Sequence, residues 1–515
     1  MECGSSLPLS LRELARAGFL TSCLPSRQQA GLTESGSELP HSKALRAFIR
    51  KLERGHNIVK KGNVTRRDFI KLGTGVAATG LAGKVTILEP SRLAAAPRAV
   101  PPSDTVRFAI VGTGIEGCKL LACSLAIPGV ECVAAADLYD GRHISAREAL
   151  GGKAIETTRE YRRLMERKDV DAIICATDDH WHRRIVEMAC QAGKDVYCEK
   201  PMSHNVEDGA AMIAAVRKYQ RICQVGSQRV SSVLYAKAKE IWESGKLGMV
   251  DTIQGVLDRN TDGGAWVNPI PPDANPQTVD WNTWNAGAPP RPFDLNRFFC
   301  WRQFHDYGSG QAGDLFVHLL SGIHFLTGTN QAPERAYSSG GIYYYKDGRD
   351  YPDLLWTLYD YPKFKLILRC NSNNASEGEC STFYGKNGTM VIRAKTLTYK
   401  PEPSCHQMDE YTVYGWPKNL RDQYQAQWKK EHPLPKVGEF KLAEDETETF
   451  SMPPGYDDKT EHLANFFHSV RTRQRALEDE VFGNHTALGC HMANQSYFNR
   501  TAVVWDAAAQ QIRNA

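Results

Sequence analysis

The sequence predicts an α/β protein: a doubly wound domain with a parallel sheet, followed by an α+β domain with a large, mostly antiparallel sheet. Strand-like and helix-like stretches alternate from about residue 105 to residue 227, which is typical of a parallel, doubly wound sheet. From residue 250 onward the strand-like stretches are longer and rich in aromatic residues. We therefore divide the chain into an N-terminal extension (1–104), a first domain (105–227) and a second domain (228–515).

The composition excludes several classes of protein. Hydrophobic residues make up 42% and charged residues 24% of the 515 residues, as in an ordinary globular protein. The chain has no run of about 18 apolar residues, which argues against a multi-span membrane protein. Residues 1–96 hold 15 of the 63 basic and 7 of the 59 acidic residues, so 48 basic and 52 acidic residues remain beyond them. This mildly acidic body predicts no nucleic-acid partner.

The N-terminal extension resembles a bacterial export signal. Residues 64–71 read Val-Thr-Arg-Arg-Asp-Phe-Ile-Lys, and a weakly apolar, Gly/Ala-rich stretch (72–83) follows them. Three alanines at 94–96 form a candidate cleavage site. Because twin-arginine signals carry folded proteins, we expect the twin-arginine translocase as a partner and a periplasmic or secreted protein. The alternative is a chance arginine pair in a polar tail.

The 14 cysteines predict neither a disulfide scaffold nor a metal site. They form no Cys-x-x-Cys pairs, and the histidines near residues 485 and 491 complete no ligand set. Several cysteines lie inside predicted strands or helices, so buried free thiols are expected. These are Cys118, Cys132, Cys175, Cys190 and Cys198.

The first domain begins with a strand at 106–111, a glycine-rich turn and a helix at 119–126. The turn reads Gly-Thr-Gly-Ile-Glu-Gly. This order places the pyrophosphate of a dinucleotide on a helix N-terminus, and the glycines allow close approach of the backbone. We therefore predict a Rossmann NAD(P)-binding domain over residues 105–227. The predicted cofactor contacts in the turn are Gly112, Thr113, Gly114 and Gly117.

A second strand, 130–136, ends in Asp137, twenty residues after Gly117. A carboxylate at this place accepts hydrogen bonds from the adenosine ribose. It also repels the additional phosphate of NADP, so NAD is the expected cofactor. NADP remains an alternative because Arg142 follows closely in the sequence.

The remaining elements continue the alternation and then change character. Further strands of the first domain are predicted at 171–176, 195–198 and 222–226, and helices at 183–192 and 206–219. Strands of the second domain are predicted at 341–345, 354–359 and 365–370.

Two segments of the first domain resemble the Gfo/Idh/MocA oxidoreductases. Residues 176–182 read Ala-Thr-Asp-Asp-His-Trp-His, and residues 192–201 read Ala-Gly-Lys-Asp-Val-Tyr-Cys-Glu-Lys-Pro. Both follow or end predicted strands at the sheet edge where ligands bind in such folds. The resemblance covers about residues 105–330 and implies NAD(P)-dependent oxidation of a secondary hydroxyl of a sugar or sugar derivative. It also implies cofactor contacts from Thr177, Glu199 and Lys200. His182 is expected either to contact the cofactor or substrate or to have a structural role at a helix N-terminus.

A further match to this family lies in the second domain, at residues 313–321. Asp314 and His318 stand four residues apart, which puts both side chains on one face of a helix. The resemblance implies that His318 accepts the hydroxyl proton and that Asp314 orients its ring. Lys200 would hold the reacting oxygen and stabilise developing negative charge. The family often has Gly at Phe316 and Asp at Ser321, which leaves the substrate contacts open.

Other residues near the predicted site are secondary candidates. His324 is a competing imidazole, and Gln224 and Arg229 are expected near the domain junction. The insert at 258–303 contains seven prolines and four tryptophans. Its aromatic rings are expected either to cover sugar rings or to pack between domains or subunits, and the second interpretation is favoured.

Three functions remain open from the sequence. The first is an exported sugar oxidoreductase with a tightly bound cofactor, because free NAD is not expected outside the cytoplasm. The second is a redox-neutral, NAD-dependent glycoside hydrolase or lyase of the same fold. The intact Glu199-Lys200-Pro201 favours the first, since the related glycosidases commonly alter it. The third is a non-catalytic protein that holds NAD. The resemblance also implies a homo-oligomer.

Overall fold

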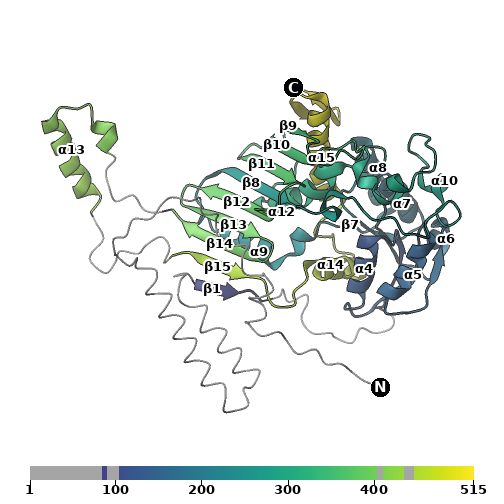
Figure 1. Ribbon diagram of the computed structural model, residues 1–515. Helices are drawn as coiled ribbons and strands as arrows, with labels where there is room; N and C mark the ends of the chain where they lie inside the picture. Colours follow the sequence, from purple (N-terminus) through teal and green to yellow (C-terminus); the bar gives the residue numbers. More distant parts are fainter. Residues whose placement is uncertain (1–83, 90–103, 403–409, 434–445) are drawn as a thin grey trace, which may run out of the picture. The chain divides into compact units, whose positions relative to one another are not determined.

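The computed structural model describes residues 84–89, 104–402, 410–433 and 446–515 (Figure 1). The predicted export signal at 64–71 and the candidate cleavage site at 94–96 lie outside these ranges. No helix within them is both long and apolar enough to cross a membrane.

The first domain is built on a parallel sheet of six strands among the described residues, in the order β4-β3-β2-β5-β6-β7. The strands are β2 (Val106–Val111), β3 (Val130–Ala136), β4 (Glu156–Thr158), β5 (Ala172–Cys175), β6 (Asp195–Cys198) and β7 (Cys223–Val225). The central strands β5 and β6 are buried at every position, because helices cover both faces of the sheet. The predicted Rossmann fold is therefore confirmed.

The helices that connect these strands are α4 (Ile115–Ser124), α5 (Asp140–Ala149), α6 (Arg162–Glu166), α7 (His182–Gln191) and α8 (Val206–Tyr219), with a 3-10 turn, η3 (Asp179–Trp181). Helix α8 begins at Asn205, whose side chain accepts a hydrogen bond from the backbone N–H of Asp208. It ends with Gln220 in the left-handed conformation, so both ends of this helix are capped.

Helix α14 (Asp458–Thr472) completes the core of the first domain from far along the chain. Leu463, Phe466 and Phe467 of this helix are fully buried against the Rossmann sheet. The ring centroids of Phe467 and Phe108 on β2 lie 5.4 Å apart. One face of the first domain thus depends on residues beyond position 228.

The second domain has eleven strands in one sheet among the described residues, in the order β1-β15-β14-β13-β12-β8-β11-β10-β9-β16-β17 (Figure 1). The first six in chain order are β1 (Lys84–Ile87), β8 (Val250–Asp258), β9 (Arg335–Gly341), β10 (Leu354–Asp360), β11 (Lys365–Asn371) and β12 (Glu379–Gly385). The other five are β13 (Gly388–Arg393), β14 (Thr396–Pro401), β15 (Glu448–Ser451), β16 (Val503–Asp506) and β17 (Gln511–Asn514). Pairing is antiparallel except for β1 with β15 and β8 with β11, which confirms the mostly antiparallel sheet.

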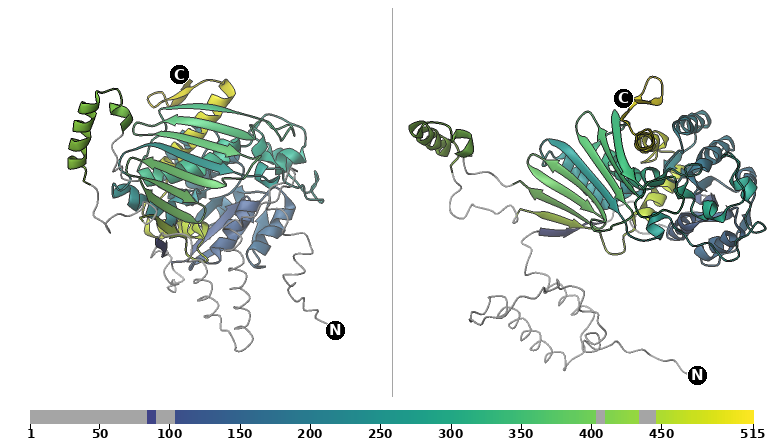
Figure 2. Two further views of the ribbon diagram at one scale, coloured as in Figure 1. Left: turned by 60° about the vertical axis from the view of Figure 1, so that its left-hand side comes forward. Right: turned by 45° about the horizontal axis from the view of Figure 1, so that its top comes forward.

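Three helices pack on one face of this large sheet (Figure 2). They are α9 (Val233–Glu243), α12 (Val317–Thr327) and α15 (Glu480–Asn499). The opposite face carries exposed large side chains, because alternate residues of each strand point to opposite faces. Tyr337 on β9 and Leu358 on β10 are register partners there, with 52% and 43% of their surface exposed.

The strand predicted at 341–345 is wrong. Strand β9 ends at Gly341, and the following three tyrosines form a turn around Asp353. The backbone N–H groups of Tyr343, Tyr344 and Tyr345 all donate to the fully buried carboxylate of Asp353. These N–H groups bond to a buried carboxylate, so they are not available for the hydrogen bonds to a neighbouring strand that would have continued β9.

The insert at 258–303 packs against the Rossmann domain. Its Trp281, Trp284, Phe298 and Phe299 share one apolar cluster with Tyr139, which follows β3. The short elements of the insert and its surroundings are η5 (Gly263–Ala265), α10 (Trp281–Trp284), α11 (Leu295–Phe299), η6 (Trp301–Gln303) and η7 (Ala312–Phe316). The other short elements are η4 (Gln228–Ser231), η8 (Glu410–Val413) and α13 (Lys418–Glu431).

Candidate active site

A cavity of about 930 Å³ lies between the carboxyl ends of the Rossmann strands, the insert and the start of α12. Most of the residues predicted from the sequence line it: Gly112, Thr113, Gly114, Asp137, Thr177, Glu199, Lys200, Asp314 and His318. Gly117 and His182 do not line it. The tertiary fold thus brings residues from positions 112 to 318 into one cleft.

The glycine-rich turn between β2 and α4 has the geometry of a dinucleotide site. Gly112 has a φ of +88°, and a Cβ there would lie 2.4 Å from the carbonyl oxygen of Ala176. A Cβ at Gly117 would lie 2.1 Å from the carbonyl oxygen of Gly112, so Gly117 shapes the turn rather than the cavity wall. Helix α4 begins after Gly114 without a side-chain cap, which leaves its first N–H groups for an anion.

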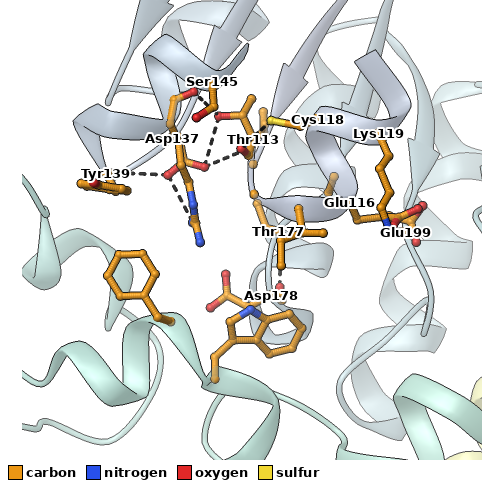
Figure 3. A pocket seen from close by; sticks show the side chains of 18 of the residues that line it. Thr113, Glu116, Cys118, Lys119, Asp137, Tyr139, Ser145, Thr177, Asp178 and Glu199 are labelled. Carbon is orange, nitrogen blue, oxygen red and sulfur yellow. Dashed lines mark hydrogen bonds and ion pairs between the residues drawn. The ribbon is translucent and has the colours of Figure 1, made fainter. Parts of the chain in front are cut away.

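Asp137 stands at the end of β3, next to this turn (Figure 3). Its carboxylate accepts hydrogen bonds from the backbone N–H groups of Thr113 (2.8 Å) and Tyr139 (3.0 Å). Arg142 lies 3.4 Å from the same carboxylate, and its guanidinium is 5.3 Å from the ring centroid of Phe298. The cavity therefore offers a carboxylate for ribose hydroxyls and a nearby guanidinium that partly neutralises it.

His182 has a supporting position instead of the predicted contact with the cofactor. Its side chain is completely buried, with Nδ1 2.9 Å from the carbonyl oxygen of Pro201 and Nε2 3.3 Å from that of Thr177. The ring thus ties the segment after β5 to the segment after β6. The sequence does not distinguish a residue that contacts the cofactor from one that supports the site, because both follow a strand at the same sheet edge.

Lys200 and Asp314 meet across the two domains. The Nζ atom of Lys200 donates to Oδ1 of Asp314 at 2.7 Å and to its backbone oxygen at 3.0 Å. Asp314 lies in η7, a π-helical turn that precedes α12. Such wide turns are frequent at functional sites.

Two further side chains hold the Asp314 carboxylate. Arg302 donates from Nε to Oδ1 at 2.9 Å, and the indole N–H of Trp266 donates to Oδ2 at 2.9 Å. Burial opposes ionisation of this carboxyl, but Lys200 and Arg302 outweigh it and hold its pKa well below the usual range. Asp314 is therefore a largely buried and ionised carboxylate, and both of its oxygens accept hydrogen bonds.

His318 lines the cavity without the expected bond to Asp314. No described residue forms a hydrogen bond with its ring, and its buried Nδ1 is unpartnered. Burial and the charges of Lys200 and Arg229 hold the pKa of His318 well below its usual range. The ring is thus neutral and able to accept a proton, but Asp314 orients Lys200 instead of the imidazole. The i, i+4 spacing predicts that the two residues share a helix face, but it does not predict the hydrogen-bond partner of either side chain.

The competing imidazole, His324, does not line the cavity. Its Nε2 lies 2.7 Å from the hydroxyl of Tyr361 inside the apolar core. Gln224 and Arg229 do not line it either: Gln224 donates to the carbonyl oxygen of His462, and Arg229 pairs with carboxylates of the second domain. Of the two candidate imidazoles, His318 is the one that the cavity exposes.

A second group of charges surrounds Glu199. Its Oε1 is buried and has no hydrogen-bond partner among the described residues. Burial, followed by the negative charge of Glu116, raises the pKa of Glu199 to about 7. Glu116, in the glycine-rich turn, forms an ion pair with Lys459 of α14.

Four cavity residues that were not predicted from the sequence bear on the chemistry of the site: Arg259, Trp266, Arg302 and Lys459. Lys459 comes from the distant helix α14, so no local pattern could associate it with the glycine-rich turn. Trp266 offered a weak signal, since it lies in the aromatic insert. Its backbone is left-handed, with φ of 59°, and Gln303 donates to its carbonyl oxygen at 3.0 Å. Such strain in a bulky residue is typical of functional positions.

One group of potential metal ligands occurs among the described residues. The ligand atoms of Cys175, His182 and Cys198 lie within 4.8 Å of one another, all buried. The two cysteines are register partners on β5 and β6, and each of the eleven described cysteines is a free thiol. Both ring nitrogens of His182 already face carbonyl oxygens. The sequence-based expectation of no metal site remains a prediction.

Comparison with known proteins identifies the first domain. Residues 106–227 match the GFO_IDH_MocA family, described as an oxidoreductase family with an NAD-binding Rossmann fold. The chain is 33% identical over 155 residues to inositol 2-dehydrogenase of Salmonella typhimurium, covering 29% of this chain and 45% of that protein. It is 26% identical over 195 residues to levoglucosan dehydrogenase of Pseudarthrobacter phenanthrenivorans, covering 36% of this chain and 42% of that protein. These matches span less than half the length of either relative.

Solved structures extend the likeness to the second domain. A levoglucosan dehydrogenase in complex with NADH and levoglucosan superposes with a TM-score of 0.54 and 16% identity, over 78% of this chain and 99% of that chain. The aldose-aldose oxidoreductase of Caulobacter crescentus superposes with a TM-score of 0.54 and 16% identity, over 78% and 99% of the two chains. At this identity the likeness establishes the two-domain fold. Residues 106–227 are thus an NAD-binding Rossmann domain of the oxidoreductase type.

Proposed function

We propose that this protein is an NAD(P)-dependent oxidoreductase that acts on a secondary hydroxyl of a sugar or sugar derivative. One observation carries the proposal: Lys200, Asp314 and His318 line the same cavity as the glycine-rich turn and Asp137. The named relatives, an inositol and a levoglucosan dehydrogenase, support this class of reaction.

The residues of the cleft fit a nicotinamide dinucleotide. The uncapped start of α4 suits the pyrophosphate, and Asp137 suits the adenosine ribose. Thr177, Glu199 and Lys200 line the remaining length of the cavity toward His318. When bound, the nicotinamide supplies a site that takes up or returns hydride.

The roles of the protein side chains follow from their contacts. His318 is neutral and without a hydrogen-bond partner among the described residues, so it can accept the hydroxyl proton of the substrate. Lys200 presents its ammonium at the same place and stabilises negative charge that develops on the reacting oxygen. Asp314 is a positioning residue, since it holds Lys200 and Arg302 in place.

We extend the proposal to export and to cofactor retention. The Arg66-Arg67 pair and the stretch after it support export through the twin-arginine translocase to the periplasm or beyond. An exported enzyme has no free cofactor pool, so the cofactor would remain bound and a second substrate would restore its redox state.

We also propose that the protein forms a homo-oligomer through the open face of the large sheet. Tyr337, Trp356 and Leu358 expose 52%, 38% and 43% of their surface there, on two neighbouring strands. Exposed apolar side chains grouped on one sheet face favour association with another surface.

The decisive experiment is a cofactor and turnover assay on the full chain, purified from cells. The expected result is close to one NAD(H) per chain after denaturation, together with absorbance changes of the bound nicotinamide on addition of oxidisable sugars. His318→Gln should keep the cofactor and lose the absorbance change. Cleavage of a glycoside without net redox change would instead favour the hydrolase or lyase. Cofactor without any Lys200- or His318-dependent reaction would favour the non-catalytic alternative.

A further inference from the structure

Arg259 lines the cavity and forms no ion pair with any described residue. It follows directly after β8, and its backbone N–H donates to the carbonyl oxygen of Asn371 at 2.7 Å. Its guanidinium makes no ion pair, side-chain hydrogen bond or aromatic contact with any residue in the described ranges. The neighbouring carboxylate, Asp258, is already paired with Arg369.

The position of Arg259 separates it from the dinucleotide half of the cleft. Its charge contributes to the lowered pKa values of Asp314 and His318. Arg259 and Gly263 line the cavity from the segment that follows β8, whereas the pyrophosphate is expected at the glycine-rich turn of the first domain.

Asp314 cannot serve as the partner of Arg259. Lys200, Arg259 and Arg302 all line the cavity, but the Asp314 carboxylate bonds to Lys200 and Arg302 only. Both oxygens of that carboxylate are engaged, because Lys200 and Arg302 donate to Oδ1 and Trp266 donates to Oδ2. A partly buried cation without a partner is costly, so an anionic ligand in this place would supply the missing partner.

Arg302 can donate hydrogen bonds to the same anion. Its guanidinium lies 4.2 Å from the ring centroid of Trp301, which restricts its plane. Only its Nε bonds to Asp314, so the two terminal nitrogens remain for another acceptor. On the other side, the turn at Gly264 packs along the stem of Arg259, where a Cβ would lie 3.1 Å from the Arg259 Cβ atom. Two guanidinium groups thus face one cavity from the insert and from β8.

We propose that the substrate is an anionic carbohydrate and that Arg259, together with Arg302, binds its carboxylate or phosphate group. Guanidinium groups bind both kinds of oxyanion through paired N–H donors. The proposal names the substrate class of the reaction proposed above and rests on it for the chemistry, but the binding itself is independent of turnover. Trp266 and Trp301 line the same cavity.

The test is calorimetric binding to the full-length protein with its bound cofactor. The probes are hexuronates, aldonates and hexose phosphates, each compared with the matching neutral sugar at one ionic strength. We expect an anionic member to bind at least about tenfold more tightly than its neutral partner. Preference among carboxylates identifies a sugar acid, and preference among phosphates a sugar phosphate.

Variants test whether Arg259 causes the tighter binding of anionic sugars. Arg259→Gln should weaken binding of the anion by about tenfold to a hundredfold and change neutral-sugar binding by less than about twofold. Arg259→Lys should recover part of the loss, which also guards against misfolding of the first variant. Arg393→Gln, a surface arginine of the same sheet, is the control and should have no effect.

Two results would overturn the inference. One is that no anionic probe binds more tightly than its neutral partner; the other is that Arg259→Gln weakens both kinds equally. Failure of the proposed oxidoreductase is distinguishable, since it would remove the nicotinamide absorbance change with every sugar and leave the Arg259-dependent binding intact.

Discussion

Replacing Asp314 by Asn should destabilise the protein strongly, because the Asp314 carboxylate pairs with two largely buried cations. Its carboxylate lies 2.7 Å from Lys200 and 2.9 Å from Arg302, and the side chain of Asp314 is only 13% exposed. Asn preserves the shape but removes the charge. Breaking a buried ion pair from one side costs about 3–5 kcal/mol, because the remaining charge is left unpaired. We expect a decrease in the free energy of unfolding of about 3 kcal/mol.

The same chain contains a matched control: a carboxylate that is 14% exposed but whose two cationic partners lie at the protein surface. Asp360 also pairs with one lysine and one arginine, Lys365 at 2.7 Å and Arg335 at 2.8 Å. Both of these partners are 57% exposed, so water replaces the lost interaction. Asp360→Asn should therefore lower the free energy of unfolding by no more than about 1 kcal/mol.

The assay is equilibrium unfolding by urea of the wild type and both variants, read by circular dichroism, with turnover measured on the folded proteins. Because Asp314 positions Lys200, its Asn variant should also lose on the order of a hundredfold in kcat. Equal destabilisation by the two substitutions would refute the account of the buried pair. Unchanged kcat in the Asp314 variant would refute its positioning role.

Three further predictions concern the proposed base His318, the proposed ribose contact Asp137 and the buried carboxyl of Glu199. His318→Gln should lower kcat by at least about a hundredfold without releasing cofactor, and a fully active variant would exclude His318 as the base. Asp137→Ala should weaken NAD binding by about tenfold in titration calorimetry, whereas unchanged affinity would show that the carboxylate does not reach the ribose. Glu199 has a pKa of about 7 in the folded protein against 4.5 in a free side chain, so the folded state holds a proton that the unfolded chain releases. Its contribution to stability is complete below about pH 4.5 and is lost as the pH rises to about 7. The free energy of unfolding of the wild type should therefore fall by on the order of 3 kcal/mol more than that of Glu199→Gln over this window. Parallel pH profiles of unfolding for the two proteins would contradict this.

Local patterns were sufficient for the Rossmann domain. The strands at 106–111, 130–136 and 195–198 and the helix at 206–219 agree with the structure at both ends. Continuous apolar runs, a glycine-rich turn and helix caps act over a few residues, so they can be recognised without knowledge of the fold. The failed strand at 341–345 shows the limit of this reasoning, because its outcome depended on Asp353, several residues away.

The sequence by itself determined the NAD-binding fold, the antiparallel second sheet and a core set of site residues, most of which line the cavity, since their signals lie in short motifs. Only the tertiary structure decided how these residues pair: Asp314 contacts Lys200, Arg302 and Trp266 instead of His318. It also placed in the cavity Arg259, which pairs with no carboxylate of the described residues. Pair formation between charged groups depends on distance and burial across elements far apart in the chain, and a linear pattern contains neither quantity.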